Sequence, residues 1–269
     1  MNGLNVLRIF MTLLVSFLLF HSTIVSANLG ARPAYVYVDL DKRNPSGTFT
    51  ITNMSDKKQV YRAKATHFVV KPNGSVFPQA VDEYSLAKWI KFNPKEFSLP
   101  PKSSREVRFT IIRKKNIEQR EYWGAIQFVP LQGTKYTQND GEGREVSVQM
   151  LTNLLIPIYG SMDGTVHTGA IDKLSGEFID DRLSLSATIN NTGEGGLRLQ
   201  GEWTVLEKTS GKEVLTQAIS PFLVLPKQKR NLTILSADKI IPGNYIFRVQ
   251  LTERDFDVLL SGQEEIEVR

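Results

Sequence analysis

The feature that most constrains the fold is a series of short runs in which apolar and polar residues alternate. Proline, glycine, asparagine and aspartate interrupt the series at regular intervals. The clearest early runs are Ala34–Leu40, Thr48–Asn53, Val60–Val70, Arg105–Ile112 and Glu121–Leu131. Because successive side chains of a strand point to opposite faces, this punctuated pattern predicts an all-β sandwich or barrel. Val81–Ile90 has some helical character, and we expect a turn there.

A second series of alternating runs follows Gly160–Gly164, a small and polar stretch typical of a domain link. Its members are Arg182–Asn191, Leu197–Glu207, Lys227–Leu235, Gly243–Thr252 and the tail to Val268. Each half contains a strand that ends in Thr-Asn or Asn-Asn, and later a proline turn that leads into a basic strand. With 269 residues, the chain is predicted to form two tandem β-sandwiches, residues 28–160 and 161–269, with few contacts beyond the link.

Residues 1–27 have the character of a secretory signal peptide. Arg8 is the one charge in this segment, an apolar run covers Ile9–Phe20, and the small residues of Val25–Ala27 form a cleavage site. An uncleaved membrane anchor is the alternative. The chain contains no cysteine. An exported protein without disulfides depends on its hydrophobic cores, which favours a bacterial periplasmic or surface protein.

The residues that commonly carry chemistry are sparse. The formal net charge is +5, a mild excess that does not indicate a nucleic-acid binder. His67 falls within a predicted strand, and His167 has no partner at metal-ligand spacing. Asn139–Gly143 lacks the acids of a calcium loop and is better interpreted as a mobile loop. No phosphate loop or nucleophile motif occurs, so we expect no enzyme activity, no cofactor, no metal and no small-molecule substrate.

Basic residues gather around one connector and the strand before it. They are Lys102, Arg105, Arg108, Arg113–Lys115 and Arg120. They are either a solvated strand edge that discourages aggregation or a patch that recognises carboxylates or another surface. The sequence alone leaves both open.

Val146–Gly160 is the most unusual stretch. Val146, Val148 and Met150 alternate with polar residues, and Leu154, Ile156 and Ile158 resume the same parity after Thr152 and Asn153. The pattern predicts one strand of about fifteen residues, roughly three times the usual length.

The order and spacing of the early runs resemble those of the periplasmic pilus-assembly chaperones of the chaperone–usher pathway (PapD-like). The resemblance rests on Gly47–Phe68, on the proline turn and strand of Phe97–Ile111, on Arg120–Leu131 and on Val146–Gly160. It implies two immunoglobulin-like domains. It also implies a periplasmic chaperone for fimbrium biogenesis, whose partners are pilus subunits and an outer-membrane usher. The alternative is a structural or adhesive surface protein with tandem immunoglobulin-like modules.

In this family, part of the last strand of the first domain is donated to a subunit that lacks a strand. The resemblance therefore assigns Val146, Val148 and Met150 to subunit binding within strand 146–158, with the rest of that strand anchored in its own domain. A strand that is entirely core of a closed sandwich is the alternative. The polar character of Gln132–Glu145 favours donation.

The sequence departs from the family at one position. Relatives hold the subunit carboxylate with an arginine on the first strand and a lysine on this last strand. Leu155 or Ile156 stands where that lysine is expected, and Arg32 is the nearest candidate for the arginine. The carboxylate anchor is therefore either built differently here or missing.

Overall fold

A computed structural model describes residues 29–139, 145–179, 182–236, 239–253 and 255–268 of the chain. The predicted signal peptide and most of the loop at Asn139–Gly143 lie outside these ranges. The described residues form β-strands and turns and contain no helix, which confirms the all-β prediction. Val81–Ile90 forms turns, as expected.

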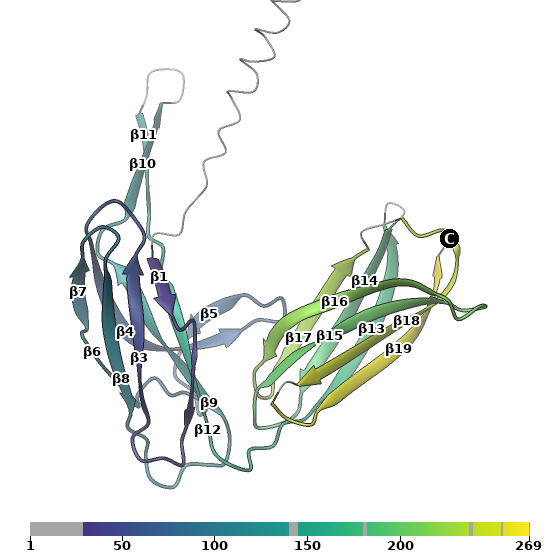
Figure 1. Ribbon diagram of the computed structural model, residues 1–269, viewed down its shortest axis with the longest axis horizontal. Coiled ribbons are helices and arrows are strands. Elements are labelled where there is room, and N and C mark those ends of the chain that lie inside the picture. Colours follow the sequence, from purple (N-terminus) through teal and green to yellow (C-terminus); the bar gives the residue numbers. More distant parts are fainter. Residues whose placement is uncertain (1–28, 140–144, 180–181, 237–238, 254, 269) are drawn as a thin grey trace, which may run out of the picture.

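The first domain is a sandwich of two sheets, with a separate hairpin (Figure 1). One sheet has the order β1-β3-β8-β6, and the other has the order β2-β12-β9-β4-β5, with β7 also paired to β4. The strands are β1 (Leu29–Arg32), β2 (Val36–Asp39), β3 (Ser46–Asn53), β4 (Gln59–Val70), β5 (Val76–Gln79), β6 (Ile90–Asn93), β7 (Glu96–Leu99), β8 (Ser104–Ile111), β9 (Tyr122–Pro130), β10 (Thr134–Asn139), β11 (Glu145–Met150) and β12 (Leu154–Ser161).

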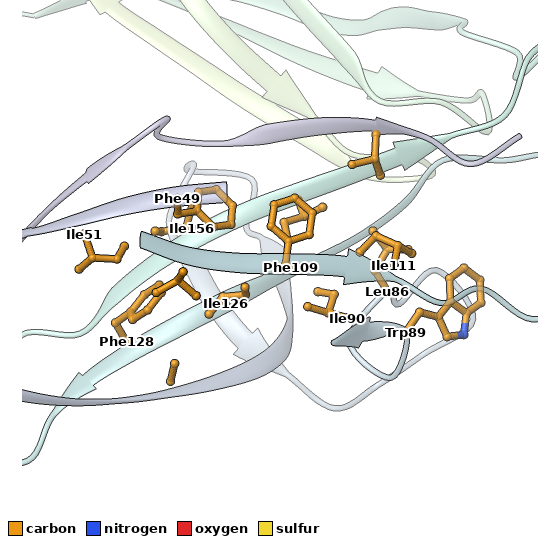
Figure 2. Close-up of a cluster of buried hydrophobic side chains, with 14 of the residues drawn as sticks. Phe49, Ile51, Leu86, Trp89, Ile90, Phe109, Ile111, Ile126, Phe128 and Ile156 are labelled. Atoms are coloured by element: carbon orange, nitrogen blue, oxygen red, sulfur yellow. The ribbon is translucent and has the colours of Figure 1, made fainter. Parts of the chain in front are cut away.

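The core of this domain comes from the alternating apolar residues identified in the sequence. Phe49 of β3 stacks on Phe109 of β8, with ring centroids 5.1 Å apart. Ile126 of β9 and Ile156 of β12 face them from the other sheet (Figure 2). All four side chains are almost completely buried, and burial of apolar area of this kind is the main stabilising contribution of a sandwich.

The second domain is also a sandwich of two sheets, with the orders β13-β14-β17 and β16-β15-β18-β19. Its core contains Trp203 and Phe247, whose rings stack 5.0 Å apart. The prediction of two tandem β-sandwiches is therefore confirmed. The strands are β13 (Gly169–Ile179), β14 (Arg182–Asn191), β15 (Leu197–Glu207), β16 (Glu213–Val224), β17 (Lys229–Leu235), β18 (Gly243–Glu253) and β19 (Leu259–Val268).

The same polar corner closes both sandwiches, at the internal repeat noted in the sequence. Asn53 ends β3 and donates its amide hydrogens to the carbonyl oxygens of Leu99 and Pro100, at 3.1 and 3.0 Å. Asn191 ends β14 and donates in the same way to Val224, at 2.9 Å. Both asparagines are fully buried. Each amide thus satisfies backbone carbonyls of the following proline turn that would otherwise be buried without a partner.

A lysine with a left-handed backbone completes each corner. Lys102 has φ 56° and Lys227 has φ 59°. The ammonium group of Lys102 donates to the Met54 carbonyl, and that of Lys227 donates to the Thr192 carbonyl, both at 2.7 Å. The two domains therefore have the same corner structure as well as the same strand pattern.

The two domains contact each other more than the sequence predicts. Leu225 of the second domain is fully buried against Phe68, Trp123 and Tyr159 of the first domain. Away from this cluster, the turn between β4 and β5 reaches across to β17 (Figure 1), where the Asn231 N–H donates to the Pro72 carbonyl at 2.7 Å. The expectation of few contacts beyond the link was wrong because these apolar residues lie on a sheet face that the strand pattern alone left unassigned.

Candidate functional site

The β10–β11 hairpin stands apart from both sandwiches and projects from one end of the first domain (Figure 1). Its two strands pair only with each other among the described residues. Val146, Val148 and Met150 occupy alternate positions of β11, opposite Gln138, Tyr136 and Thr134 of β10. The other edge of β11 therefore has backbone hydrogen-bonding groups that no described strand satisfies.

The prediction of one continuous strand over 146–158 was wrong. The chain leaves strand geometry at Leu151–Asn153, so β11 and β12 are separate strands in separate sheets. Leu151 is 55% exposed. The alternation keeps its parity across this break, which is why the sequence pattern did not reveal it.

The C-terminal part of the stretch is anchored in its own domain, as predicted. β12 pairs antiparallel with β9 and parallel with β2. Ile156 and Ile158 are buried in the core, and Leu154 packs against it. Leu155, one of the two residues at the expected lysine position, is half-buried against the apolar cluster between the domains.

Arg32, the candidate carboxylate anchor, is the exposed last residue of β1 and lies opposite Thr50 of β3. It does not line the cavities found between the two domains in the described part of the chain. The structure thus does not bring Arg32 together with the residues of that cleft.

A different arginine occupies the cleft between the domains. Arg198 of β15 forms a two-pronged ion pair with Glu121 of the first domain, with an Nη2–Oε1 distance of 2.7 Å and an Nη1–Oε2 distance of 3.2 Å. Its guanidinium group also donates to the Tyr37 hydroxyl and lies 4.4 Å from the centroid of that ring. The Glu121 side chain is 2% exposed and that of Arg198 is 16% exposed, so the pair is buried.

The electrostatic environment favours the charged form of Arg198. Burial by itself lowers its pKa, but the Glu121 carboxylate and its hydrogen bonds raise the pKa above the ordinary value. Burial also raises the pKa of Tyr159, which packs beside Tyr37 at a centroid distance of 5.5 Å. The cleft therefore contains a neutral tyrosine pair and a cation whose charge is already balanced.

A second polar group also joins the domains. Arg120, which belongs to the basic connector of the sequence, is 12% exposed and pairs with Glu83 at 2.8 Å. It lies 3.7 Å from Glu194 of the second domain, which Lys227 also contacts at 2.9 Å. Arg120 is therefore a contact between domains, whereas Arg105 and Arg108 are exposed on β8.

Sequence reasoning missed Arg198 and Glu121. The two residues lie 77 positions apart, in different domains, and neither forms part of a recognisable motif. The basic residues that precede Glu121 were identified in the sequence, but Arg198, the partner of Glu121 across the cleft, was not.

His67 and His167 have structural surroundings. His67 is buried beside Trp123, with its Nε2 atom 3.0 Å from Asp82. His167 stacks on Phe256 at 3.6 Å and contacts the Gly196 carbonyl through Nδ1 at 3.1 Å. Within the described ranges, no group of three or more His, Cys, Asp or Glu side chains is placed to hold a metal ion. The same residues include no helix with the length and apolarity that a bilayer crossing requires.

Several solved structures are similar to this chain over most of its length. The YadV chaperone is 10% identical, with a TM-score of 0.47, and the match covers 89% of this chain and 100% of that chain. The class 5 fimbriae chaperone CfaA is 13% identical, with a TM-score of 0.43 and coverage of 88% and 98%. A complex of the Salmonella enterica SafA pilin with the SafB chaperone gives 12% identity, a TM-score of 0.42 and coverage of 90% and 97%.

All three names mention a chaperone, and two of them also mention fimbriae or a pilin. At 10–13% identity, the likeness is one of fold. No family model matches this sequence, and no curated protein matches it either.

Proposed function

We propose that this protein is a periplasmic chaperone that binds and caps pilus subunits and delivers them to an outer-membrane usher. The observation that carries the proposal is the β10–β11 hairpin, in which β11 pairs with a strand on one edge only within the described part of the chain. The hairpin lies at the position where the sequence resemblance puts the donated strand.

An open strand edge is suited to a partner that lacks a strand. Backbone groups along such an edge supply affinity, and alternate side chains supply specificity by filling pockets of the partner. We propose that Val146, Val148 and Met150 fill these pockets. The buried Ile156 and Ile158 hold the base of the hairpin in the first domain.

The export of the protein follows from the same proposal. Cleavage after Ala27 releases a mature chain that begins at Asn28 in the periplasm. Mass spectrometry of the exported protein measures this N-terminus directly. An intact Met1 in a membrane fraction contradicts the proposed localisation.

Three substitutions test the donated strand. Val148→Asp places a charge in the apolar groove of a subunit, where an unpaired charge is strongly disfavoured, so capture of subunits from a piliated strain is lost. If the proposal holds, the same change lowers the stability of the free protein by less than about 1 kcal/mol. Ser147→Asp is the matched control, because Ser147 is an exposed neighbour at the alternate position of β11, and it retains capture.

Ile156→Asp is the second control. Ile156 is 1% exposed, so this change unfolds the first domain whether or not β11 is donated. Thermal melts of the variants, measured together with the capture assay, distinguish a donated β11 from a β11 that belongs to the core. A loss of melting temperature for Val148→Asp as large as that for Ile156→Asp shows that β11 is core and ends the proposal.

We also propose that Arg32 contributes to anchoring a subunit carboxylate. It is exposed at the end of β1, so Arg32→Gln leaves the melting temperature unchanged while it weakens subunit capture. Capture at the wild-type level by Arg32→Gln removes this residue from the site.

A further inference from the structure

The cleft between the domains contains a cavity of about 400 Å³ that the donated strand does not use. Tyr35, which directly precedes β2, and Tyr37 of β2 form one wall of the first domain together with Tyr159 of β12. The opposite wall comes from β15, β16 and the turn after β18, through Arg198, Phe222 and Asp255. The cavity is therefore completed only when the two domains are in contact.

The aromatic wall is suited to a cation. Tyr35 and Tyr37 are each about half exposed, and their rings meet edge to face with centroids 5.3 Å apart. Arg198 already stacks on Tyr37 and Tyr159, with distances of 4.4 and 5.2 Å to the ring centroids. Tyr35 has no such cation among its described contacts. Its ring face remains available to a guanidinium or ammonium group.

The charges around the cavity disfavour an anion. The charge of Arg198 is balanced by Glu121, which is buried with it. Asp255 lines the cavity together with Arg198, but it belongs to none of the ion pairs found among the described residues. Among the described lining residues, a carboxylate in this cavity would meet Asp255 and an arginine that is already paired.

The adjoining cavities extend the negative region. Together, the three cavities are lined by five carboxylates and two cations, a formal excess of three negative charges, in a chain whose net charge is +5. Burial lowers the pKa of His167, which lines two of them, so this residue adds no positive charge at neutral pH. The carboxylates are Asp39, Asp41, Glu121, Asp163 and Asp255, and the cations are Lys42 and Arg198.

We infer that the cleft binds a basic side chain, arginine or lysine, on an extended segment of the bound protein. Its cation lies on the Tyr35 ring and pairs with Asp255. The inference rests on the proposed function for the identity of the bound protein, a pilus subunit. It assigns to the cleft a ligand opposite in charge to the carboxylate that the family resemblance implies, and it agrees with the apolar Leu155 and Ile156 at the expected lysine position.

Two short peptides test this charge preference. Acetyl-Gly-Arg-Gly-amide and acetyl-Gly-Glu-Gly-amide are titrated into the mature protein labelled on tyrosine, and the ring resonances of Tyr35 and Tyr37 are followed by NMR. We expect shifts with the arginine peptide only, and weaker binding as the salt concentration rises. Equal or tighter binding of the glutamate peptide overturns the inference.

A pair of neighbouring aspartates supplies the matched variants. Asp255→Asn removes the proposed ion-pair partner and weakens binding of the arginine peptide about fivefold, as expected for a partly exposed pair. Asp257→Asn alters the same turn, but Asp257 lines none of the described cavities, so binding is unchanged. An unchanged affinity for Asp255→Asn, or an equal loss for both variants, overturns the inference.

The same preparation is also tested for capture of pilus subunits. If it captures subunits but its cleft does not bind the arginine peptide, the cleft inference fails and the proposed function stands. If it binds the peptide but captures no subunit, the proposed function fails and the cationic preference of the cleft stands.

Discussion

Glu121→Gln is the substitution that most directly tests the contact between the domains. The Glu121 carboxylate accepts two hydrogen bonds from the Arg198 guanidinium group and one from the Gly196 N–H, at 2.7 to 3.2 Å. A glutamine of the same shape has one oxygen and one NH₂ group. Either orientation of the amide directs its NH₂ group at another donor, and the charge that balances Arg198 is lost.

The cost follows from burial. Removal of one partner of a buried ion pair typically destabilises a protein by about 3–5 kcal/mol, because the remaining charge is buried without compensation. Arg198 retains 16% exposure of its side chain, so we expect the lower end, about 3 kcal/mol. Urea denaturation followed by tryptophan fluorescence measures this change, since Trp89 lies in the core of the first domain, Trp203 in that of the second and Trp123 in the cluster between them.

Glu96→Gln is the matched control. Glu96 pairs with Arg62 at 3.0 Å, but the two side chains are 50% and 64% exposed. A pair exposed to this degree contributes less than about 1 kcal/mol. The double variant Glu121→Gln, Arg198→Met should recover at least half of the loss, because it removes the unpaired charge. If Glu121→Gln costs no more than Glu96→Gln, the ion pair is solvated in solution and the reasoning is refuted.

Three further predictions concern stability. Asn53→Ala and Asn191→Ala each leave buried carbonyl oxygens without a donor, so each should lower the free energy of unfolding by about 2–3 kcal/mol in urea denaturation. A smaller loss than that caused by replacing an exposed asparagine with alanine contradicts the role of the corner. Leu225→Ala removes the fully buried side chain that fills the cluster between the domains, so it should cost about 3 kcal/mol and separate the two domain transitions; a single unchanged transition speaks against the contact. Burial lowers the pKa of His167, so its contribution to stability is complete above about pH 6.5 and is lost as the pH falls through the lowered value. His167→Phe should make the free energy of unfolding depend less on pH below neutrality. If the slope against pH is unaltered, other groups cause the pH dependence.

Strict alternation allowed the best predictions of the fold. Arg182–Asn191 and Leu197–Glu207 were predicted as strands from their pattern and form β14 and β15 with those bounds. β13 was not predicted, because its partly buried residues do not alternate and its pairing with β14 shifts between Ile171 and Lys173. β16 was also missed: the polar Gln217 lies on the same, less exposed face as Leu215 and Ile219, so its apolar and polar residues do not separate by face.

The candidate site was only partly visible in the sequence. The apolar residues of β11 and β12 were identified because they alternate locally. The cleft was not, because each of its walls is ordinary strand sequence until the two domains meet. Tyr37 and Arg198 are 161 positions apart, and no local pattern relates them. A site that depends on the orientation of two domains requires the tertiary structure.

The open edge of the strand that we propose is donated leads toward this cleft. β9 pairs with one edge of β12 from Leu154 to Gly160, but β2 pairs with the other edge only from Ile158 onward. Among the described residues, no strand therefore pairs with Leu154–Pro157 on the edge that β2 covers further along. No described strand pairs with the edge of β11 that faces away from β10 either. A subunit strand added along this edge would end where β2 begins, next to Tyr35 and Tyr37. Strand addition and the charge preference of the cleft would then act on successive parts of the same subunit segment.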